Sequence, residues 1–445
     1  MSSRGRPSRL LAVLGTAALL VGAGGCADDD DSGGPATTSP DDEGSELTAS
    51  ARGVTADSIT VGYSYLDFEA LVSLGVASSG YGDQELAFQT MVDALNDAGG
   101  INGRQVEVVY APYSPIGTEE AEAACLRLTQ DEEVFAVLGG FLGPAEPTNS
   151  CIVGQQETIL VGGVQSEERL AEAAAPWITD RAPRSELADI LLTLLESEGR
   201  LEDQSVALVT NTDAQDAHDA ILAALDDHGV TPVEDLALDA PIGDFPAEDA
   251  AWAALGERVR TSGAEVVLVA GNPSSTIRNV ASMGLDVEVW ALDPESLLNL
   301  GTSVDLEDAR GVLTASQPGD LLEADSFADC RDTFAEANPD VALLAPEELG
   351  ETDEDVVAGI SLACSFLDLF VAVAELAGPD LTNESFAAAV EGGELEDFSI
   401  ATQPFASLGP DKFFSNDSFR LVAFDPDAGP TGGLAPESDV VDINP

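Results

Sequence analysis

Residues 96–115 read Asn-Asp-Ala-Gly-Gly-Ile-Asn-Gly-Arg-Gln-Val-Glu-Val-Val-Tyr-Ala-Pro-Tyr-Ser-Pro, and this stretch decides the fold. The apolar side chains before it recur at the spacing of one helix face, at Phe88, Met91, Val92 and Leu95. This spacing predicts a helix over 84–97. Gly99 is expected to end that helix, because glycine readily adopts the left-handed backbone conformation found at helix C-termini.

The second half of the stretch predicts a tight turn followed by a strand. Asn102 and Gly103 both tolerate positive φ, which a tight turn requires. The β-branched run over 106–109 favours a strand, and the two prolines after it end that strand. A helix, a tight turn and a strand form one unit of an alternating α/β sheet.

The segment 96–104 also resembles a motif of the type I periplasmic solute-binding proteins, the branched-chain amino acid receptor family of ABC importers. In that family a helix ends in Asn-x-x-Gly-Gly-Ile-Asn-Gly-Arg before the second strand. The resemblance covers most of residues 54–425 and is strongest over 80–163. It implies a two-lobed type I periplasmic-binding α/β fold, in which each lobe is a mostly parallel sheet flanked by helices and a three-strand hinge joins the lobes.

Strand and helix patterns alternate along the chain, and the alternation restarts near residue 185. Crossovers through helices imply parallel strands with helices on both faces of each sheet. We therefore expect two similar lobes. The expected division is a signal peptide over 1–25, a disordered acidic tether over 26–53, a first lobe over 54–182 and a second lobe over 183–316. The resemblance implies that 317–400 returns to the first lobe and that 401–445 supplies the C-terminal strands and tail of the second.

The N-terminus has the pattern of an export signal. Arginines precede an apolar run over 10–21, and small residues then lead to Cys26. The run is short for a membrane span. Cys26 resembles the lipidated cysteine of a bacterial lipobox, although Ala23 stands where leucine is usual. We expect Cys26 to carry a diacyl anchor that holds an extracytoplasmic protein at the outer face of the cell membrane. The alternative is ordinary cleavage with an incidental cysteine.

Composition narrows the possible functions. The chain has 445 residues, a formal net charge of −65 and 44% hydrophobic residues, so it can build two cores. Such an acidic surface repels phosphate backbones and argues against nucleic-acid partners. No Asp-x-Asp-x-Asp-Gly loop ending in Glu supports calcium binding, and we expect neither metal nor cofactor.

Four cysteines remain besides Cys26, an even number in an exported chain. Three connectivities are possible, and local pairing of Cys125 with Cys151 and of Cys330 with Cys364 is the simplest. The first of these pairs matches a disulfide common in the resembled family. A metal cluster is the competing interpretation, but the spacing lacks Cys-x-x-Cys pairs and companion histidines.

The sequence gives no sign of an enzyme. His218 and His228 are the only histidines, and each lies in a polar helical context. Nucleophile elbows, phosphate loops and paired histidine ligands are all missing from the sequence. We therefore expect a binding protein.

Ligands of parallel α/β sheets bind at the carboxyl ends of the strands. The expected loops there carry aromatic and apolar groups in the first lobe and polar groups in the second. In the first lobe, Phe141 and Leu142 stand where the resembled receptors have a serine-rich loop. We expect few basic residues near these loops, so strongly anionic solutes should bind poorly. The candidate ligand-binding residues are Tyr63, Tyr65, Phe68, Phe141, Leu142, Gly163, Val164, Gln165, Asn211, Asp213, Asn272 and Asp293.

These patterns and the resemblance predict a monomeric receptor. It would capture an amino acid, an amide or a small organic acid between its lobes and deliver it to an ABC permease. One alternative is a ligand-sensing surface lipoprotein of the same fold that signals to a membrane or cell-wall partner. An exported hydrolase is the other alternative.

Overall fold

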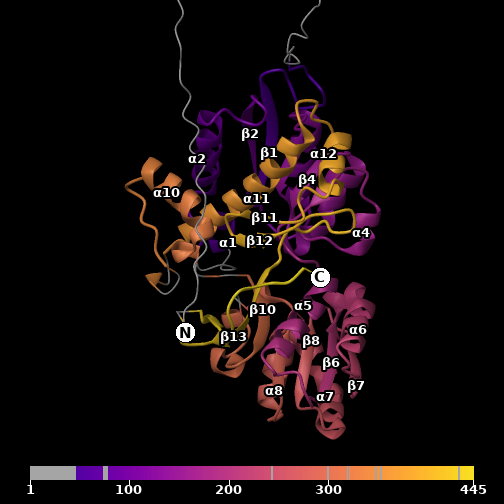
Figure 1. Cartoon of the computed structure of the whole chain (residues 1–445). Coiled ribbons are helices and arrows are strands. Elements are labelled where there is room, and N and C mark those ends of the chain that lie inside the picture. The colour runs from indigo at the N-terminus through magenta and orange to yellow at the C-terminus, as the bar shows by residue number, and fades with distance from the viewer. Residues whose placement is uncertain are drawn as a thin grey trace, which may run out of the picture. The chain divides into compact units, whose positions relative to one another are not determined.

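The computed structural model describes residues 47–73, 79–241, 244–297, 300–317, 319, 321–345, 348–350, 353–428 and 431–444. Two large β-sheets organise this part of the chain (Figure 1). The first has the order β2-β1-β3-β4-β5, and all of its strand pairs are parallel. Its strands are β1 (Ser58–Leu66), β2 (Gln105–Tyr113), β3 (Ala136–Gly139), β4 (Ile159–Gly162) and β5 (Trp177–Ile178).

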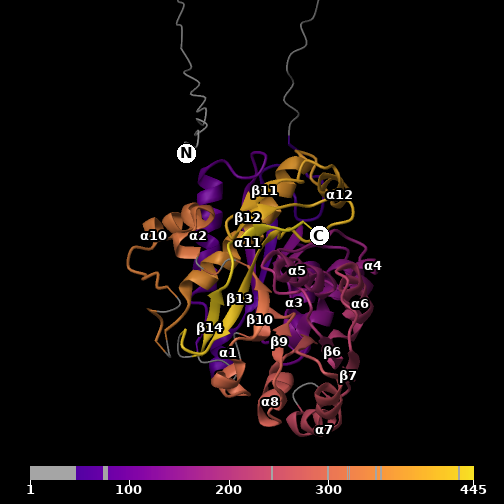
Figure 2. The same cartoon turned by 60° about the horizontal axis from the view of Figure 1, so that its bottom comes forward.

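The second sheet has the order β14-β13-β10-β9-β8-β6-β7. Strands β6 to β10 run parallel, whereas β13 and β14 are antiparallel additions beside β10 (Figure 2). The short β15 pairs antiparallel with the start of β13, at Ser418 and Phe419. The strands are β6 (Val206–Asn211), β7 (Glu234–Leu238), β8 (Val266–Ala270), β9 (Glu288–Ala291), β10 (Leu313–Ser316), β13 (Ser418–Asp425), β14 (Gly433–Pro436) and β15 (Val441–Asp442).

Helices cover both faces of the first sheet. Side chains alternate between the faces of a strand, so Val61 and Leu138 join one apolar cluster while Val137 and Leu160 join another. The first cluster includes residues of helices from the late part of the chain, such as Phe334 and Leu367, which pack with residues of the first sheet. The helical elements around this sheet are α1 (Phe68–Ser73), α2 (Gln84–Asp97), α3 (Glu119–Leu126), η1 (Arg127–Asp131), η2 (Gly143–Thr148), η3 (Cys151–Gln155), α4 (Glu167–Ala171), η7 (Leu321–Glu323), η8 (Asp325–Phe327), α10 (Ala328–Ala337), α11 (Val356–Ala377) and α12 (Asn383–Glu391).

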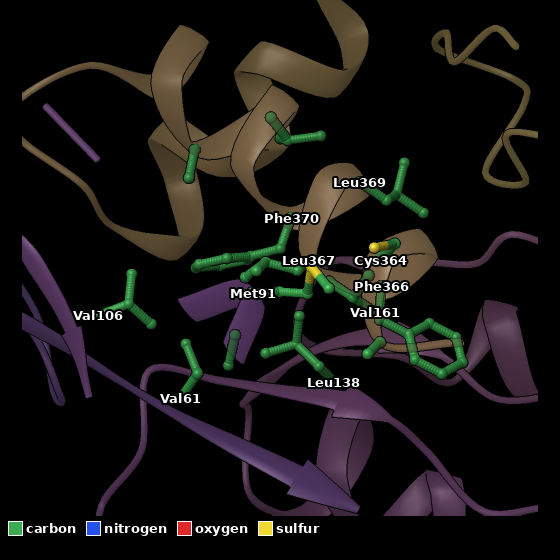
Figure 3. Close-up of a cluster of buried hydrophobic side chains, with 14 of the residues drawn as sticks. Val61, Met91, Val106, Leu138, Val161, Cys364, Phe366, Leu367, Leu369 and Phe370 are labelled. Carbon is green, nitrogen blue, oxygen red and sulfur yellow. The ribbon is translucent and has the colours of Figure 1, made fainter. Parts of the chain in front are cut away.

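Helix α11 is the centre of that first cluster. Cys364, Leu367 and Phe370 on α11 lie over Val61 and Leu138 of the sheet (Figure 3). Among the described residues, α11 alone is long and apolar enough to span a membrane by length and composition, with a mean hydropathy of 2.3. Because 67% of that apolar window is buried inside the fold, packing against the sheet accounts for its composition.

The second sheet also has an apolar cluster on each face. Helices α5 and α6 pack on one face, and α7 and α8 pack on the other. These elements are α5 (Arg184–Ser197), η4 (Thr212–Ala217), α6 (His218–Asp227), α7 (Phe245–Ser262), α8 (Ser274–Ser282), α9 (Pro294–Leu297), η5 (Leu300–Thr302) and η6 (Leu306–Ala309).

Three connections between the two sheets form the hinge. They follow β5, β10 and the hairpin of β11 (Phe398–Ile400) and β12 (Gln403–Ala406). The backbone carbonyl of Asp180 in the first connection accepts hydrogen bonds from Gln317 Nε2 at 3.1 Å and Gln403 Nε2 at 2.7 Å. The same carbonyl thus ties the first connection to both others.

The helix end and the turn of the stretch 96–115 fold as the sequence predicts, but β2 runs through Pro112 to Tyr113 and does not end at the first proline. Helix α2 ends at Asp97, and Gly99 has a φ of 117°. The Gly100 amide donates to the Leu95 carbonyl at 2.9 Å, which completes a Schellman-type helix end. The Asn96 side chain accepts from the Val106 amide at 2.7 Å and donates to the Val106 carbonyl at 2.9 Å, so it fixes β2 against the end of α2.

Several expected boundaries differ from the structure. The expected tether runs to residue 53, but 47–53 are held against the first lobe, because Arg104 donates to the Thr48 carbonyl at 2.9 Å and Arg52 donates to the Gln156 carbonyl at 3.1 Å. The signal peptide, Cys26 and the tether up to residue 46 lie outside the described residues. Helix α3 continues directly into the π-helical turn η1.

Candidate functional site

Loops at the carboxyl ends of both sheets meet beside the hinge. Arg181, which follows β5, forms an ion pair with Glu295 in α9, which follows β9. Arg184 Nη2 lies 3.9 Å from Asp293 Oδ2, and Arg184 Nη1 donates to the Asp213 carbonyl at 3.2 Å. Since Asp213 follows β6, residues from three strand ends converge here.

The first lobe contributes a further ion pair to the same place. Glu146, in η2, places its Oε2 atom 3.5 Å from Arg169 Nη2. Glu146 also interacts electrostatically with Arg184, Asp293 and Glu295, and burial raises the pKa of its carboxyl. Charges from both lobes and the hinge thus belong to one group, the hinge charge cluster: Glu146, Arg169, Asp180, Arg181, Arg184, Asp213, Asp293 and Glu295.

The carboxylates of this cluster are surrounded by protein but not sealed from water. Desolvation raises the pKa of Glu295, and Arg181 partly opposes the effect. The Glu295 side chain nevertheless remains 60% exposed. Desolvation also raises the pKa of Asp180 and that of Asp213, again against the effect of a neighbouring arginine. A solute can therefore reach the Glu295 carboxylate, whereas Asp180 is buried.

Two buried acceptors in this region lack hydrogen-bond partners. Asp180 is 5% exposed, and its Oδ1 atom has no partner within hydrogen-bonding distance. Asn211, at the end of β6, is 6% exposed, and its Oδ1 atom is likewise unpaired. Its Nδ2 atom donates to the Asn272 carbonyl. Because a carbonyl can only accept, the unpaired atom of Asn211 is the oxygen.

Four predicted residues of the second lobe lie together at this site. The Asn272 backbone amide donates to Asp213 Oδ2 at 3.1 Å, and the Asn211 side-chain amide donates a hydrogen bond to the Asn272 carbonyl. Asp293 lies beside Arg184 and accepts from Ser296 Oγ at 2.9 Å. The polar half of the predicted site is therefore one connected group in space.

The aromatic half of the prediction is placed differently. Tyr63 is 1% exposed and stacks on Phe88, with ring centroids 4.1 Å apart. Phe141 is fully buried and meets the edge of Tyr113 at 4.9 Å. Strand alternation turns the Tyr63 ring toward α2, and the Phe141 ring is enclosed beside Tyr113. We therefore assign both rings to the core and leave them out of the proposed site.

Other predicted residues of the first lobe hold loops in place. Tyr65 donates to Glu85 Oε1 at 2.5 Å, and Phe68 packs on Tyr81 with ring centroids 4.4 Å apart. The Leu142 amide donates to the Tyr113 hydroxyl at 2.9 Å, and the Val164 carbonyl accepts from Arg169 at 3.0 Å.

Gln165 and Gly163 shape the end of β4. Gln165 Nε2 donates to the Trp177 carbonyl at 2.9 Å and to the Phe413 carbonyl at 3.3 Å, so it links β5 to the third hinge connection. Gly163 has a φ of 72°, and a Cβ there would come within 2.9 Å of the Asn149 side chain. Close packing of the β3 and β4 loops thus requires glycine at this position.

The charged half of the site is missing from the prediction. Arg169, Arg181 and Arg184 all lie in the hinge charge cluster, so the expectation of few basic residues near these loops is wrong. A signal for two of them was present. Arg181 and Arg184 are two of only 17 lysine and arginine residues in the chain, and they stand within four positions of each other.

Comparison with known proteins identifies the family. The family model described as periplasmic binding protein matches residues 73–427. The chain belongs to the periplasmic binding protein family. Family membership confirms the predicted resemblance and places this binding protein among extracytoplasmic receptors. No curated protein matches the sequence.

Solved structures share the fold of this binding protein at low sequence identity. A fatty acid ABC transporter substrate-binding protein from Thermomonospora curvata is 14% identical, with a TM-score of 0.58 over 89% of this chain and 95% of that one. A solute binding protein of an ABC transporter from Rhodopseudomonas palustris, in complex with 3,4-dihydroxybenzoic acid, is 14% identical, with a TM-score of 0.57 over 87% and 98%. A branched-chain amino acid transporter substrate-binding protein from Streptococcus pneumoniae, in complex with isoleucine, is 16% identical, with a TM-score of 0.56 over 87% and 100%.

No group of three or more His, Cys, Asp or Glu side chains in the described part of the chain is arranged to hold a metal ion. The cysteines there are paired in disulfides, Cys125 with Cys151 and Cys330 with Cys364. This is the local pairing that the sequence favours.

Proposed function

We propose that this protein is the solute-binding component of an ABC importer, which captures a small solute between its lobes and delivers it to a permease. The observation that carries the proposal is the hinge charge cluster, where strand ends of both sheets meet around ion pairs such as Arg181 with Glu295. In α/β sheets, ligands bind outside the carboxyl ends of the strands. The names of the structural neighbours, which are ABC transporter substrate-binding proteins, support the same role.

The proposed mechanism is hinge closure. Each lobe has its own apolar clusters, so each can move as a rigid body. The three connections are joined at the Asp180 carbonyl, which makes this point a natural pivot. A solute that contacts charged groups of both lobes binds the closed form better and shifts the population toward it. The permease would then recognise the closed form.

The ligand class that we propose is a small polar solute, such as an amino acid, an amide or a small organic acid. The cluster presents guanidinium groups as well as carboxylates, so it can contact a molecule with charged or polar ends. The neighbours from Rhodopseudomonas palustris and Streptococcus pneumoniae hold 3,4-dihydroxybenzoic acid and isoleucine, solutes of this size.

A thermal-shift panel tests the binding role. We expect at least one stabilising solute among small amino acids, amides and aromatic acids, because a ligand at a hundredfold excess over its Kd adds about 2.7 kcal/mol to the free energy of unfolding. Arg184→Gln should reduce that shift. Arg310→Gln, which removes an arginine paired with Glu307 and Asp427 on the second lobe, should leave it unchanged. A broad panel that yields no stabiliser would contradict the proposal.

We also propose that Cys26 carries the membrane anchor, on the sequence pattern alone. Two acyl chains bind a bilayer stably, whereas one chain binds it only marginally. Cys26→Ser should therefore move the protein from the membrane fraction to the soluble fraction of fractionated cells. Retention of the variant in membranes after a salt wash would rule out this anchor.

A further inference from the structure

The only lysine of the chain, Lys412, lies in the third hinge connection. It closes a tight turn, in which the Gly409 amide donates to the Lys412 carbonyl at 3.1 Å and the Lys412 amide donates to the Gly409 carbonyl at 3.2 Å. The Lys412 side chain is only 13% exposed, and its Nζ atom lies 4.8 Å from the centroid of the Phe414 ring. An ammonium group enclosed in this way needs polar partners, because burial of an unpaired charge is costly.

Three side chains act as partners of this ammonium group. Lys412 Nζ donates to Ser407 Oγ at 2.8 Å and to Asn444 Oδ1 at 3.0 Å. It also forms an ion pair with Asp417, whose side chain is 3% exposed. Burial lowers the pKa of the Lys412 ammonium, and the contact with Asp417 opposes that effect. Asp417 directly precedes β13, and Asn444 lies in the C-terminal segment beyond β15, so one lysine joins the hinge connection to two parts of the second lobe.

These contacts cross the point where the third connection passes from one lobe to the other. On the first-lobe side, the Leu408 amide donates to the Leu395 carbonyl at 2.7 Å, and both side chains lie in the apolar cluster around α11. Phe413, directly after the lysine, packs against the same cluster. On the second-lobe side, the Ile443 amide donates to the Asp417 carbonyl at 2.8 Å, and the Ile443 side chain lies in an apolar cluster of the second sheet. The lysine therefore lies on the first-lobe side, and two of its partners lie on the other.

The backbone between the lysine and Asp417 pairs with the first hinge connection. The Thr179 amide donates to the Phe413 carbonyl at 3.0 Å, and the Ser415 amide donates to the Thr179 carbonyl at 2.8 Å. Hinge rotation takes place at a few connecting residues, so this paired segment is where the third connection would bend. The lysine and its second-lobe partners lie on opposite sides of the segment, and rotation of the lobes therefore changes the distances between them.

We propose that Lys412, Asp417 and Asn444 form a hinge latch, which restricts rotation of the second lobe and so sets the balance between open and closed forms before a solute arrives. The latch acts on the hinge closure described above and so rests on the proposed function, but it concerns control of the motion and not the solute. A latch that changes the fraction of binding-competent protein changes the apparent affinity for every solute by the same factor.

Spin labels on the two lobes measure this motion without any solute. Ala94→Cys in α2 and Ala254→Cys in α7 place one label at an exposed helix position of each lobe. Double electron–electron resonance then gives the distribution of distances between the labels. Lys412→Met removes the charge and keeps an apolar side chain of similar length against the Phe414 ring. We expect this variant to have a wider distance distribution than the wild type, because its lobes rotate more freely.

A second measurement follows the latch itself. Because Lys412 is the only lysine, acetic anhydride finds no other amine in the chain except a free N-terminus, and peptide mass spectrometry separates the two products. Asn444→Ala removes one contact of the latch at an exposed position, so it does not endanger the fold. It should raise the acetylation rate of Lys412 by at least about threefold, because the remaining contacts open more often. It should also widen the distance distribution, though less than Lys412→Met does.

Arg310→Met is the matched control, since it removes a cation that is paired with Glu307 and Asp427 inside the second lobe, and it should change neither measurement. An unchanged distance distribution in Lys412→Met would overturn the latch, even if the urea midpoint falls, because the lysine would then serve stability alone. If that variant does not fold, an unchanged distribution and an unchanged acetylation rate in Asn444→Ala overturn it instead. Neither measurement uses a solute, so failure of the latch leaves the binding role to the thermal-shift panel.

Discussion

Gly100→Ala is expected to lower the free energy of unfolding by more than about 3 kcal/mol. Gly100 has a φ of 66°, where an alanine costs about 1–2 kcal/mol. A Cβ at this position would lie 1.9 Å from the Arg104 carbonyl oxygen. That oxygen accepts from the Ile101 amide at 2.9 Å, so relief of the clash would break the turn between α2 and β2, and each lost hydrogen bond costs about 1 kcal/mol.

The neighbouring glycine provides the control for this experiment. Gly99 has a φ of 117°, and a Cβ there would have no atom within 4 Å. Gly99→Ala should therefore cost only the conformational strain, about 1–2 kcal/mol. Urea unfolding at a constant m-value measures both variants. Equal losses would show that the close approach of Arg104 does not restrict this position.

This stretch also shows what sequence alone can predict. The expected helix over 84–97 agrees residue for residue with α2, because its apolar spacing, its end signal and the following turn all lie within a short segment. The strand expected over 106–109 likewise falls inside β2. Local patterns of this kind need no knowledge of distant contacts.

Elements without a local pattern were missed. Strand β7 has the sequence Glu-Asp-Leu-Ala-Leu, and its acidic start hides the alternation of buried Leu236 and Leu238. The two-residue strand β5 depends wholly on pairing with β4.

The candidate site divides in the same way. Asn211, Asp213, Asn272 and Asp293 could be named from the sequence because each follows a recognisable strand. The pairing of Arg181 with Glu295 could not, since 114 positions separate the two residues. The burial of Tyr63 against Phe88 could not be predicted either, because a tyrosine in such a strand can contact a ligand or pack in the core.

The two disulfides lie on opposite faces of the first sheet, and they join different helices. Cys125 in α3 pairs with Cys151 in η3, whereas Cys330 in α10 pairs with Cys364 in α11. The first pair lies in the apolar cluster that contains Val137, and the second lies in the cluster around α11. Each bridge therefore stabilises its own face of the sheet.

Removal of either bridge by a double Cys→Ala change is expected to cost about 3.5 kcal/mol of unfolding free energy in the chain-entropy model. The sequence separations are 26 and 34, and the entropy of loop closure depends only on the logarithm of the loop length. The two variants should therefore lose nearly equal amounts, although one bridge joins neighbouring elements and the other joins helices of the returning segment.

Urea denaturation of both double variants and of the oxidised wild type measures these losses. Both double variants should unfold at a lower urea midpoint than the wild type, by similar amounts. The quadruple variant should have a lower midpoint than either, because the bridges lie in separate clusters and their effects should add. A midpoint that stays at the wild-type value in one double variant would mean that its bridge constrains the unfolded chain no more than residual structure already does. In that case the packing around α11 or α3, and not the bridge, would hold that face of the lobe together.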